Sequence, residues 1–207
     1  MPYIPGTHNP LLKDVSLDIE RGEHIILLGD NGSGKSSLFK LITGEYKLSS
    51  GKITFANDER KPRIATLSQS TADNICLPLT VYENARLYLQ SSKKNRLIEL
   101  NKAAIGDFIT QYHPGIKDKL DTPVGALSGG ERQLLALVLC ILLQPDLLLL
   151  DEHTSALDPE KSKYVMQLTE RMIKEQGITC VMITHNLSHL AKDARIVEMT
   201  EGTLKVH

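Results

Sequence analysis

A glycine-rich stretch in the first quarter of the chain carries the residue types that hold a phosphate chain. It fits the pattern G-x-x-x-x-G-K-[ST] and consists of Gly29, Asp30, Asn31, Gly32, Ser33, Gly34, Lys35, Ser36 and Ser37. Glycines let successive backbone N–H groups face a phosphate, and a helix N-terminus adds partial positive charge. Lys35 would bridge the outer phosphates while the Ser36 hydroxyl holds Mg²⁺. A glycine-rich turn without a ligand is the alternative, but the stretch lies between a strand pattern and a helix pattern, as a phosphate loop does.

Two adjacent carboxylates form a second candidate for chemistry. Residues 147–150 are four leucines, the pattern of a buried strand, and they run directly into Asp151 and Glu152. Ligands of open α/β folds bind at the carboxyl edge of the sheet, so both acids are expected beside the phosphate loop. Asp151 suits the outer coordination sphere of Mg²⁺, and Glu152 suits a base that polarises an attacking water. A single acid here could merely cap a helix, whereas a pair after a buried strand favours catalysis.

A third motif precedes the leucine-rich middle of the chain and reads Leu127, Ser128, Gly129, Gly130, Glu131, Arg132, Gln133. Ser128 and Glu131 have the spacing of a capping box, in which each side chain bonds the backbone of the other residue. A capped helix N-terminus with bare glycine backbone also suits an anion. The same turn can therefore start a helix and bind a phosphate.

The elements that must position these motifs alternate along the chain. Strand patterns fall at residues 15–19, 24–28, 52–55, 64–68, 147–150 and 179–184, with a final hairpin around Glu201 and Gly202. Helical patterns fall at residues 35–43, 80–90 and 94–112, from Gly130 onward, after Asp158 and Pro159, and after residue 184. Strands that alternate with helices imply a parallel sheet covered on both faces, so we expect an α/β domain with a helical insertion near residues 70–130.

The composition excludes several classes of protein. The 207 residues include 24 Lys plus Arg and 25 Asp plus Glu, so no basic field favours nucleic acid, and we expect no nucleic-acid partner. The longest apolar run, 134–143, is too short for the roughly 20 residues of a membrane span. Cys76, Cys140 and Cys180 stand far apart among apolar neighbours and are predicted to be buried free thiols. No secretory signal pattern opens the chain, which favours a cytoplasmic protein.

The three motifs together resemble the Walker A, Walker B and signature sequences of the ATP-binding cassette (ABC) family. The resemblance implies one ABC ATPase domain over residues 1–207, with a P-loop NTPase core at about 1–70 and 145–207. It also implies a mostly parallel sheet, an antiparallel β edge subdomain and a helical subdomain at about 71–144. ATP and Mg²⁺ are the implied ligands. In this family Ser128, Gly129, Gly130 and Glu131 would face the γ-phosphate held by a second chain, giving a head-to-tail dimer around two ATP molecules.

The resemblance assigns further residues one at a time. Gln69 lies where the Q-loop glutamine contacts Mg²⁺ and the lytic water, although a solvated loop glutamine is the alternative. Asp158 falls in the D-loop, which couples the two sites, and it is also a plausible helix cap. His185 resembles the switch histidine, and Tyr3 the aromatic residue that stacks on adenine, with an ordinary surface tyrosine as the alternative. His153 departs from the family, which usually has proline at that position.

These assignments give a catalytic set of Lys35, Gln69, Glu152 and His185 and a metal set of Ser36, Gln69 and Asp151. The implied function is hydrolysis of ATP to drive separate permease subunits, with import of a small solute. The stretch that begins with Asn74 and ends with Glu83 resembles the region that receives a permease helix. A solute-binding protein is a further expected partner, and the chain would lie on the cytoplasmic face of the inner membrane.

Two other functions stay open at this point. One is a soluble or non-import ABC ATPase that serves cluster assembly, cell division or lipoprotein release. The other is a module that senses ATP without useful turnover, which is disfavoured because every catalytic position is filled.

Overall fold

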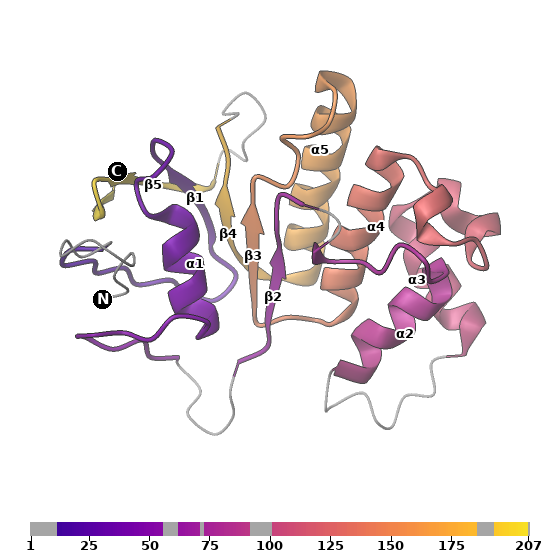
Figure 1. Ribbon diagram of the computed structural model, residues 1–207, viewed down its shortest axis with the longest axis horizontal. Coiled ribbons are helices and arrows are strands. Elements are labelled where there is room, and N and C mark those ends of the chain that lie inside the picture. Colours follow the sequence, from indigo (N-terminus) through magenta and orange to yellow (C-terminus); the bar gives the residue numbers. More distant parts are fainter. Residues whose placement is uncertain (1–11, 56–61, 71–72, 92–100, 186–192, 207) are drawn as a thin grey trace.

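A six-stranded sheet forms the centre of the computed structural model, which describes residues 12–55, 62–70, 73–91, 101–185 and 193–206 (Figure 1). Its strands lie in the order β2-β3-β4-β1-β5-β6. They are β1 His24–Leu28, β2 Ile64–Leu67, β3 Leu147–Asp151, β4 Thr179–Ile183, β5 Arg195–Thr200 and β6 Thr203–Val206. All neighbours run parallel except β5 and β6, which are antiparallel. The expected α/β fold with a mostly parallel sheet and an antiparallel edge is therefore confirmed.

Helices cover both faces of this sheet, as the mostly apolar central strands require. Alternate residues of β3 enter different clusters, because Leu147 and Leu149 pack with helix α1 (Lys35–Thr43). Leu148 and Leu150 instead face the opposite side, where they pack with α4 (Gly129–Leu142) and α5 (Pro159–Gln176). Consequently α1 and α4 lie on opposite faces of the sheet.

The remaining helices gather beside α4, to the right of the sheet in Figure 1. They are α2 Val81–Ser91, α3 Lys102–Tyr112 and the 3-10 helices η3 Pro114–Lys119 and η4 Val124–Ala126. Thr80 and Glu83 form the expected capping box of α2, with Oε2 of Glu83 accepting the Thr80 N–H at 2.8 Å. These helices and α4 lie between β2 and β3 in the chain, and the division into a core and a helical subdomain stays a prediction. None of the helices in the described ranges has the length and apolarity to cross a membrane.

Two predicted strands are wrong. Residues 15–19 and 52–55 are not assigned as strands, although the first segment alternates as expected, with Val15, Leu17 and Ile19 against the α1 side of the core. Alternation marks the face that packs on a core, whereas a strand also needs a partner that supplies ladder hydrogen bonds. Residues 52–54 are exposed, so no buried face holds that segment in a sheet.

Other boundaries shift or lie beyond the described ranges. The helix predicted over 94–112 begins at Lys102 in the described residues, where Asn101 caps it. The helix predicted after residue 184 lies largely at 186–192, outside the described residues. Cys76 is exposed, contrary to expectation, while Cys140 and Cys180 are buried free thiols as predicted.

Candidate functional site

The glycine-rich stretch forms a loop between β1 and α1, and its backbone demands glycine at its first position. Gly29 has a φ of 142°, and a Cβ there would lie 2.1 Å from the carbonyl oxygen of Met199 on β5. At the other end Gly34 occupies the N-cap of α1 with a φ of 113° and supplies no side-chain cap. Because this N-cap has no side chain to accept them, the first N–H groups of α1 are available to a ligand, as anion binding requires.

Lys35 lies folded over this loop. Its side chain is buried, and Nζ donates to the carbonyl oxygens of Gly29 at 2.7 Å and Asp30 at 2.9 Å. The hairpin between β5 and β6 supports the loop from outside, because the Gly202 N–H donates to the Ser33 carbonyl at 3.0 Å. The ammonium is therefore held at the mouth of the loop by acceptors that phosphate oxygens can replace.

Ser36 and Asp151 meet at the start of α1 and the end of β3. The Ser36 hydroxyl donates to Oδ2 of Asp151 at 2.8 Å. Burial raises the pKa of Asp151, and this effect is opposed by the hydrogen bond from Ser36 and by the charge of Lys35. Mg²⁺ in proteins is bound by oxygen ligands such as hydroxyl and carboxylate oxygens, so these two residues fit that ion.

Gln69 lies just beyond β2, the neighbour of β3 in the sheet. Its side-chain nitrogen donates to Oγ of Ser155 at 3.1 Å, in the segment between Glu152 and α5. The structure thus brings Gln69 to the segment that follows the acid pair, while its contact with Mg²⁺ stays a prediction.

Glu152 and His185 meet at the carboxyl ends of the adjacent strands β3 and β4. Nε2 of His185 lies 2.9 Å from Oε1 of Glu152. The backbone of Glu152 has a φ of 45°, a left-handed conformation that few side chains adopt. Its N–H donates to the Ile183 carbonyl at 3.0 Å, which ties this residue to β4. Strained backbones held by surrounding structure cluster at active sites, consistent with the role expected for Glu152.

His153 has a contact that sequence analysis did not find. Its side chain is buried and Nε2 lies 3.1 Å from Oγ1 of Thr169 on α5. The Thr169 hydroxyl donates to the Val165 carbonyl at 2.8 Å, so Nε2 of His153 carries the proton in this pair. Burial lowers the pKa of His153 to about 4. The ring links the segment after the acid pair to α5. No spacing in the sequence predicts this contact between His153 and Thr169.

The turn at residues 128–131 is built as the capping box predicted. Ser128 accepts the N–H of Glu131 at 3.3 Å, and Oε2 of Glu131 accepts the Ser128 N–H at 2.8 Å. Gly129 and Gly130, which lie between Ser128 and Glu131, are the first two residues of α4. A Cβ at Gly129 would meet nothing within 4 Å. Lys119 of η3 donates to Oε1 of Glu131 at 2.6 Å, a second contact that the sequence did not indicate.

Asp158 caps α5, as its position before Pro159 suggested. Its side chain accepts the Lys161 N–H at 3.1 Å and pairs with the Lys161 ammonium at 2.8 Å. Tyr3, the expected adenine contact, lies outside the described residues. The roles of all these residues toward ATP stay predictions.

The structure gathers the predicted residues into two groups. The glycine-rich loop, Asp151, Glu152 and His185 lie at the carboxyl ends of β1, β3 and β4. The 128–131 turn begins α4, on the face of the sheet opposite α1. Two surfaces that each suit an anion therefore belong to different layers of the same chain.

The sequence of this chain is also similar to those of known proteins. The model of a family described as ABC transporter matches residues 12–155. A tyrosine transport ATP-binding protein of Clostridioides difficile is 37% identical, over 97% of this chain and 84% of that protein.

Solved structures are similar to this chain as well. CbiO1 of Clostridium perfringens, described as part of an ABC transporter complex, matches with a TM-score of 0.79 at 29% identity, over 99% of this chain and 83% of that one. A dimeric ATP-binding cassette bound to ADP and Pi matches with a TM-score of 0.78 at 24% identity, over 95% of this chain and 90% of that one, a likeness of fold.

Proposed function

Because the chain belongs to the ABC transporter family and is one of its ATP-hydrolysing cassettes, we propose that it dimerises around two MgATP and drives separate permease subunits. The proposal extends to import of a small solute, as the name of the tyrosine transport relative suggests. A solute-binding protein is a further proposed partner. The proposed location is the cytoplasmic face of the membrane that holds the permease.

The observation that carries the catalytic part of the proposal is the contact between Glu152 and His185 beside the phosphate loop. The N–H groups at the start of α1 would bind the outer phosphates, and Lys35 would exchange its two loop carbonyls for phosphate oxygens. Ser36 and Asp151 would hold Mg²⁺, which neutralises phosphate charge when bound. Glu152 would then accept the proton of the attacking water, with His185 fixing the carboxylate in place.

The dimer part rests on the two-layer arrangement. The helix that begins at the phosphate loop and the helix that begins at the 128–131 turn pack on opposite faces of one sheet. One triphosphate can be held between both turns if the second turn comes from another chain. The solved cassette with ADP and Pi is described as dimeric, which is a statement about that protein and supports the same arrangement here.

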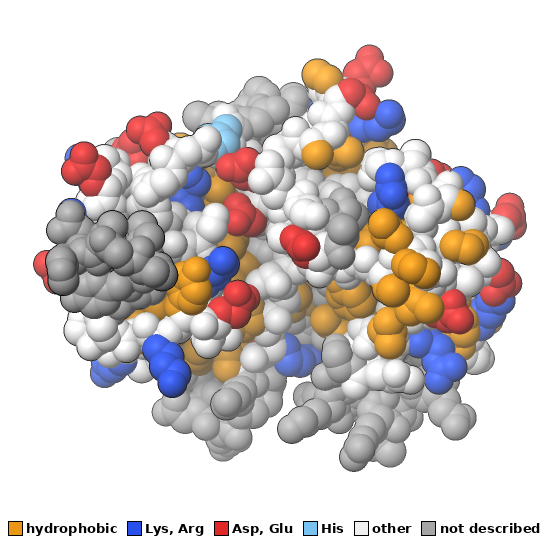
Figure 2. All heavy atoms as spheres, in the orientation of Figure 1, with side chains coloured by type: hydrophobic (Ala, Val, Ile, Leu, Met, Phe, Trp, Pro, Cys, Tyr) orange, Lys and Arg blue, Asp and Glu red, His pale blue; other side chains and the backbone are white. Residues whose placement is uncertain are grey.

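The permease part rests on the surface of the helical region. Side chains of hydrophobic residues gather there on the right of Figure 2, and Leu87 of α2 is 49% exposed. Asn74 connects this surface to the end of β2, because its side chain donates to the Thr66 carbonyl at 2.8 Å and accepts the Ser68 N–H at 3.1 Å. A helix seated on residues 74–83 would thus contact a segment that is hydrogen-bonded to the strand before Gln69.

The test of catalysis and dimerisation is Glu152→Gln, which removes the base and leaves the hydrogen-bonding shape. We expect hydrolysis to fall by about 10²- to 10⁴-fold and a stable dimer to appear with MgATP in size-exclusion chromatography with light scattering. Adding Lys35→Ala to this variant should abolish the dimer, since the phosphate loop loses its cation. A Glu152→Gln variant that stays monomeric at saturating MgATP would contradict the proposal.

The permease partner is tested by affinity purification of the tagged chain from detergent-solubilised membranes of its source cells. A polytopic membrane protein should co-purify in stoichiometric amount with the chain. Its recovery should fall when Leu87 is replaced by Glu, with Ile53→Glu, at an exposed position away from the helical region, as the matched control. A chain recovered without any membrane protein would contradict the transport role and favour a soluble ATPase.

A further inference from the structure

The 128–131 turn contains a negative charge where the proposed function needs an anion to approach. Glu131 uses both carboxylate oxygens, since Oε2 accepts the Ser128 N–H at 2.8 Å and Oε1 accepts Nζ of Lys119 at 2.6 Å. Side chains of both partners are accessible to solvent, at 42% for Lys119 and 25% for Glu131. The ion pair therefore lies at the rim of the turn and not in the core.

Protonation does not remove the charge of this carboxylate. The hydrogen bond from Lys119 and then that from the Ser128 backbone lower the pKa of Glu131 to about 2. The group is thus ionised at any physiological pH. A phosphate that approaches the N–H groups of Gly129 and Gly130 meets a carboxylate on the same turn of helix, and like charges at close range oppose binding.

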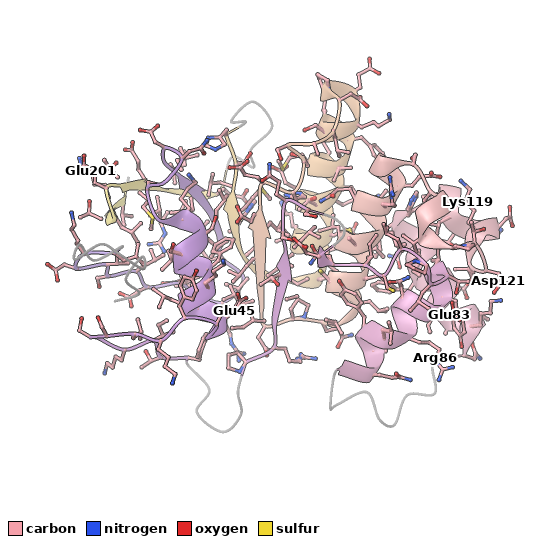
Figure 3. All side chains as sticks on the ribbon, viewed as in Figure 1. Glu45, Glu83, Arg86, Lys119, Asp121 and Glu201 are labelled. Carbon is pink, nitrogen blue, oxygen red and sulfur yellow. The ribbon has the colours of Figure 1, made fainter. Side chains whose placement is uncertain are left out.

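Lys119 comes from a different element than the turn that it contacts. It ends η3, in the helical region, and Figure 3 labels it on that side of the molecule, away from Glu45 and Glu201. Its ammonium is a compact cation that neutralises the Glu131 carboxylate through Oε1, the oxygen that does not bond the Ser128 backbone. The capping box alone does not need this cation, since Glu131 already bonds the Ser128 backbone.

We propose that Lys119 is a positioning residue for ATP-driven pairing of two chains, which neutralises Glu131 so that the 128–131 turn can accept the phosphate of the partner's nucleotide. The inference rests on the proposed dimer and adds the residue that makes the turn electrostatically compatible with an anion. An ordinary solvated ion pair is the competing account, and exposed pairs of that kind contribute little to stability.

The two accounts differ in what happens when the charge of Glu131 is removed. Glutamine at position 131 can still complete a capping box, because its side-chain oxygen accepts the same backbone N–H. If Lys119 acts by neutralising the carboxylate, its loss should matter only while Glu131 is charged. If Lys119 acts by bracing the helical region, its loss should matter equally in both backgrounds.

The experiment is a charge cycle in the Glu152→Gln chain, with the MgATP concentration at half-maximal dimer as the measured quantity. Lys119→Met should raise that concentration about fivefold or more, and Glu131→Gln should lower it, because the carboxylate that repels the phosphate is gone. The double variant should return to the value of Glu131→Gln. Lys117→Met, an exposed lysine of the same 3-10 helix, is the matched control and should have no effect.

A second measurement separates a local effect on the turn from general damage. ATP binding to the monomeric chain, followed with a fluorescent nucleotide at low protein concentration, should be the same in Lys119→Met and in its parent. An unchanged dimer midpoint in Lys119→Met, or a double variant as weak as Lys119→Met alone, would overturn the inference and leave the proposed function standing. A Glu152→Gln parent that does not dimerise at all would overturn both.

Discussion

Glu152 is held by contacts with the end of β4 and with the turn that follows it in the sequence. Its N–H bonds the end of β4, its carboxylate meets His185, and its carbonyl accepts the Ser155 N–H at 3.0 Å. These contacts maintain a left-handed φ of 45°, which an isolated glutamate would avoid. The carboxylate direction is therefore set by the fold before any nucleotide binds.

The neighbouring His153 leads to a prediction about pH and stability. Its pKa falls from an ordinary 6.5 to about 4 in the folded chain because the ring is buried. The unfolded chain thus binds more protons between these values, so this stabilisation is complete above about pH 6.5 and is lost as the pH falls toward 4. We expect about 2 kcal/mol of the free energy of unfolding to be lost from this group between pH 7 and pH 5.

Urea unfolding of the metal-free protein at pH 7, 6 and 5 measures this loss. His153→Gln keeps a donor for Thr169 and removes the titration, so its stability should fall by about 2 kcal/mol less over the same range. Burial also lowers the pKa values of His24 and His113. Both histidines are present in wild type and in His153→Gln, so their contributions to the pH dependence cancel in the comparison. Parallel pH curves for wild type and His153→Gln would refute the prediction.

Among the elements, α3 offers a clean test of capping outside the nucleotide site. Asn101 has an extended backbone at the N-cap, and Oδ1 accepts the Ala104 N–H at 2.9 Å. Asn101→Ala should reduce the free energy of unfolding by about 1 kcal/mol, because one backbone donor loses its partner. Asn101→Asp keeps an acceptor and should stay close to wild type. Equal urea midpoints for the alanine and aspartate variants would show that the cap contributes nothing.

Local patterns account for the parts of the site that could be predicted. The phosphate loop, the capping box of Ser128 and Glu131, and the cap at Asp158 all depend on residues within a few positions, so spacing alone reveals them. The contact between Glu152 and His185 was not among these predictions, since His185 was assigned only by its resemblance to the switch histidine. That contact depends on β3 and β4 being neighbours in the sheet, an order that the alternation of elements does not fix.

Tertiary contacts without a local pattern were missed. Lys119 at the end of η3 contacts Glu131 in the first turn of α4, and His153 contacts Thr169 on α5. In the sequence, nothing distinguishes Lys119 from an ordinary surface lysine or His153 from an ordinary buried polar residue. The unformed strands at 15–19 and 52–55 have the opposite cause, since an alternating pattern was present and the described part of the chain pairs no strand with either segment.

For the whole molecule, the reactivity of the three cysteines measures how well the helices on the two faces of the sheet exclude solvent from the core. Burial raises the pKa of Cys140 to about 12 and raises that of Cys180 as well, whereas Cys76 is exposed. Alkylation needs a thiolate with access to solvent. Iodoacetamide at pH 8 should therefore label only Cys76 in the folded chain and all three cysteines in urea, as read by mass spectrometry of peptides. Labelling of Cys140 or Cys180 at the rate of Cys76 would mean that the core opens freely.

The sheet order also bears on how the protein is made. β1 leads into the phosphate loop, yet its two neighbours are β4 and β5, and the loop itself is bonded by Gly202 of the last hairpin. A ribosome releases β1 long before it synthesises either neighbour. During translation the nascent chain must keep that early apolar strand unpaired, which makes it a natural client for chaperones. Truncated mRNAs that stop before the hairpin between β5 and β6 should consequently give polypeptides that do not bind nucleotide.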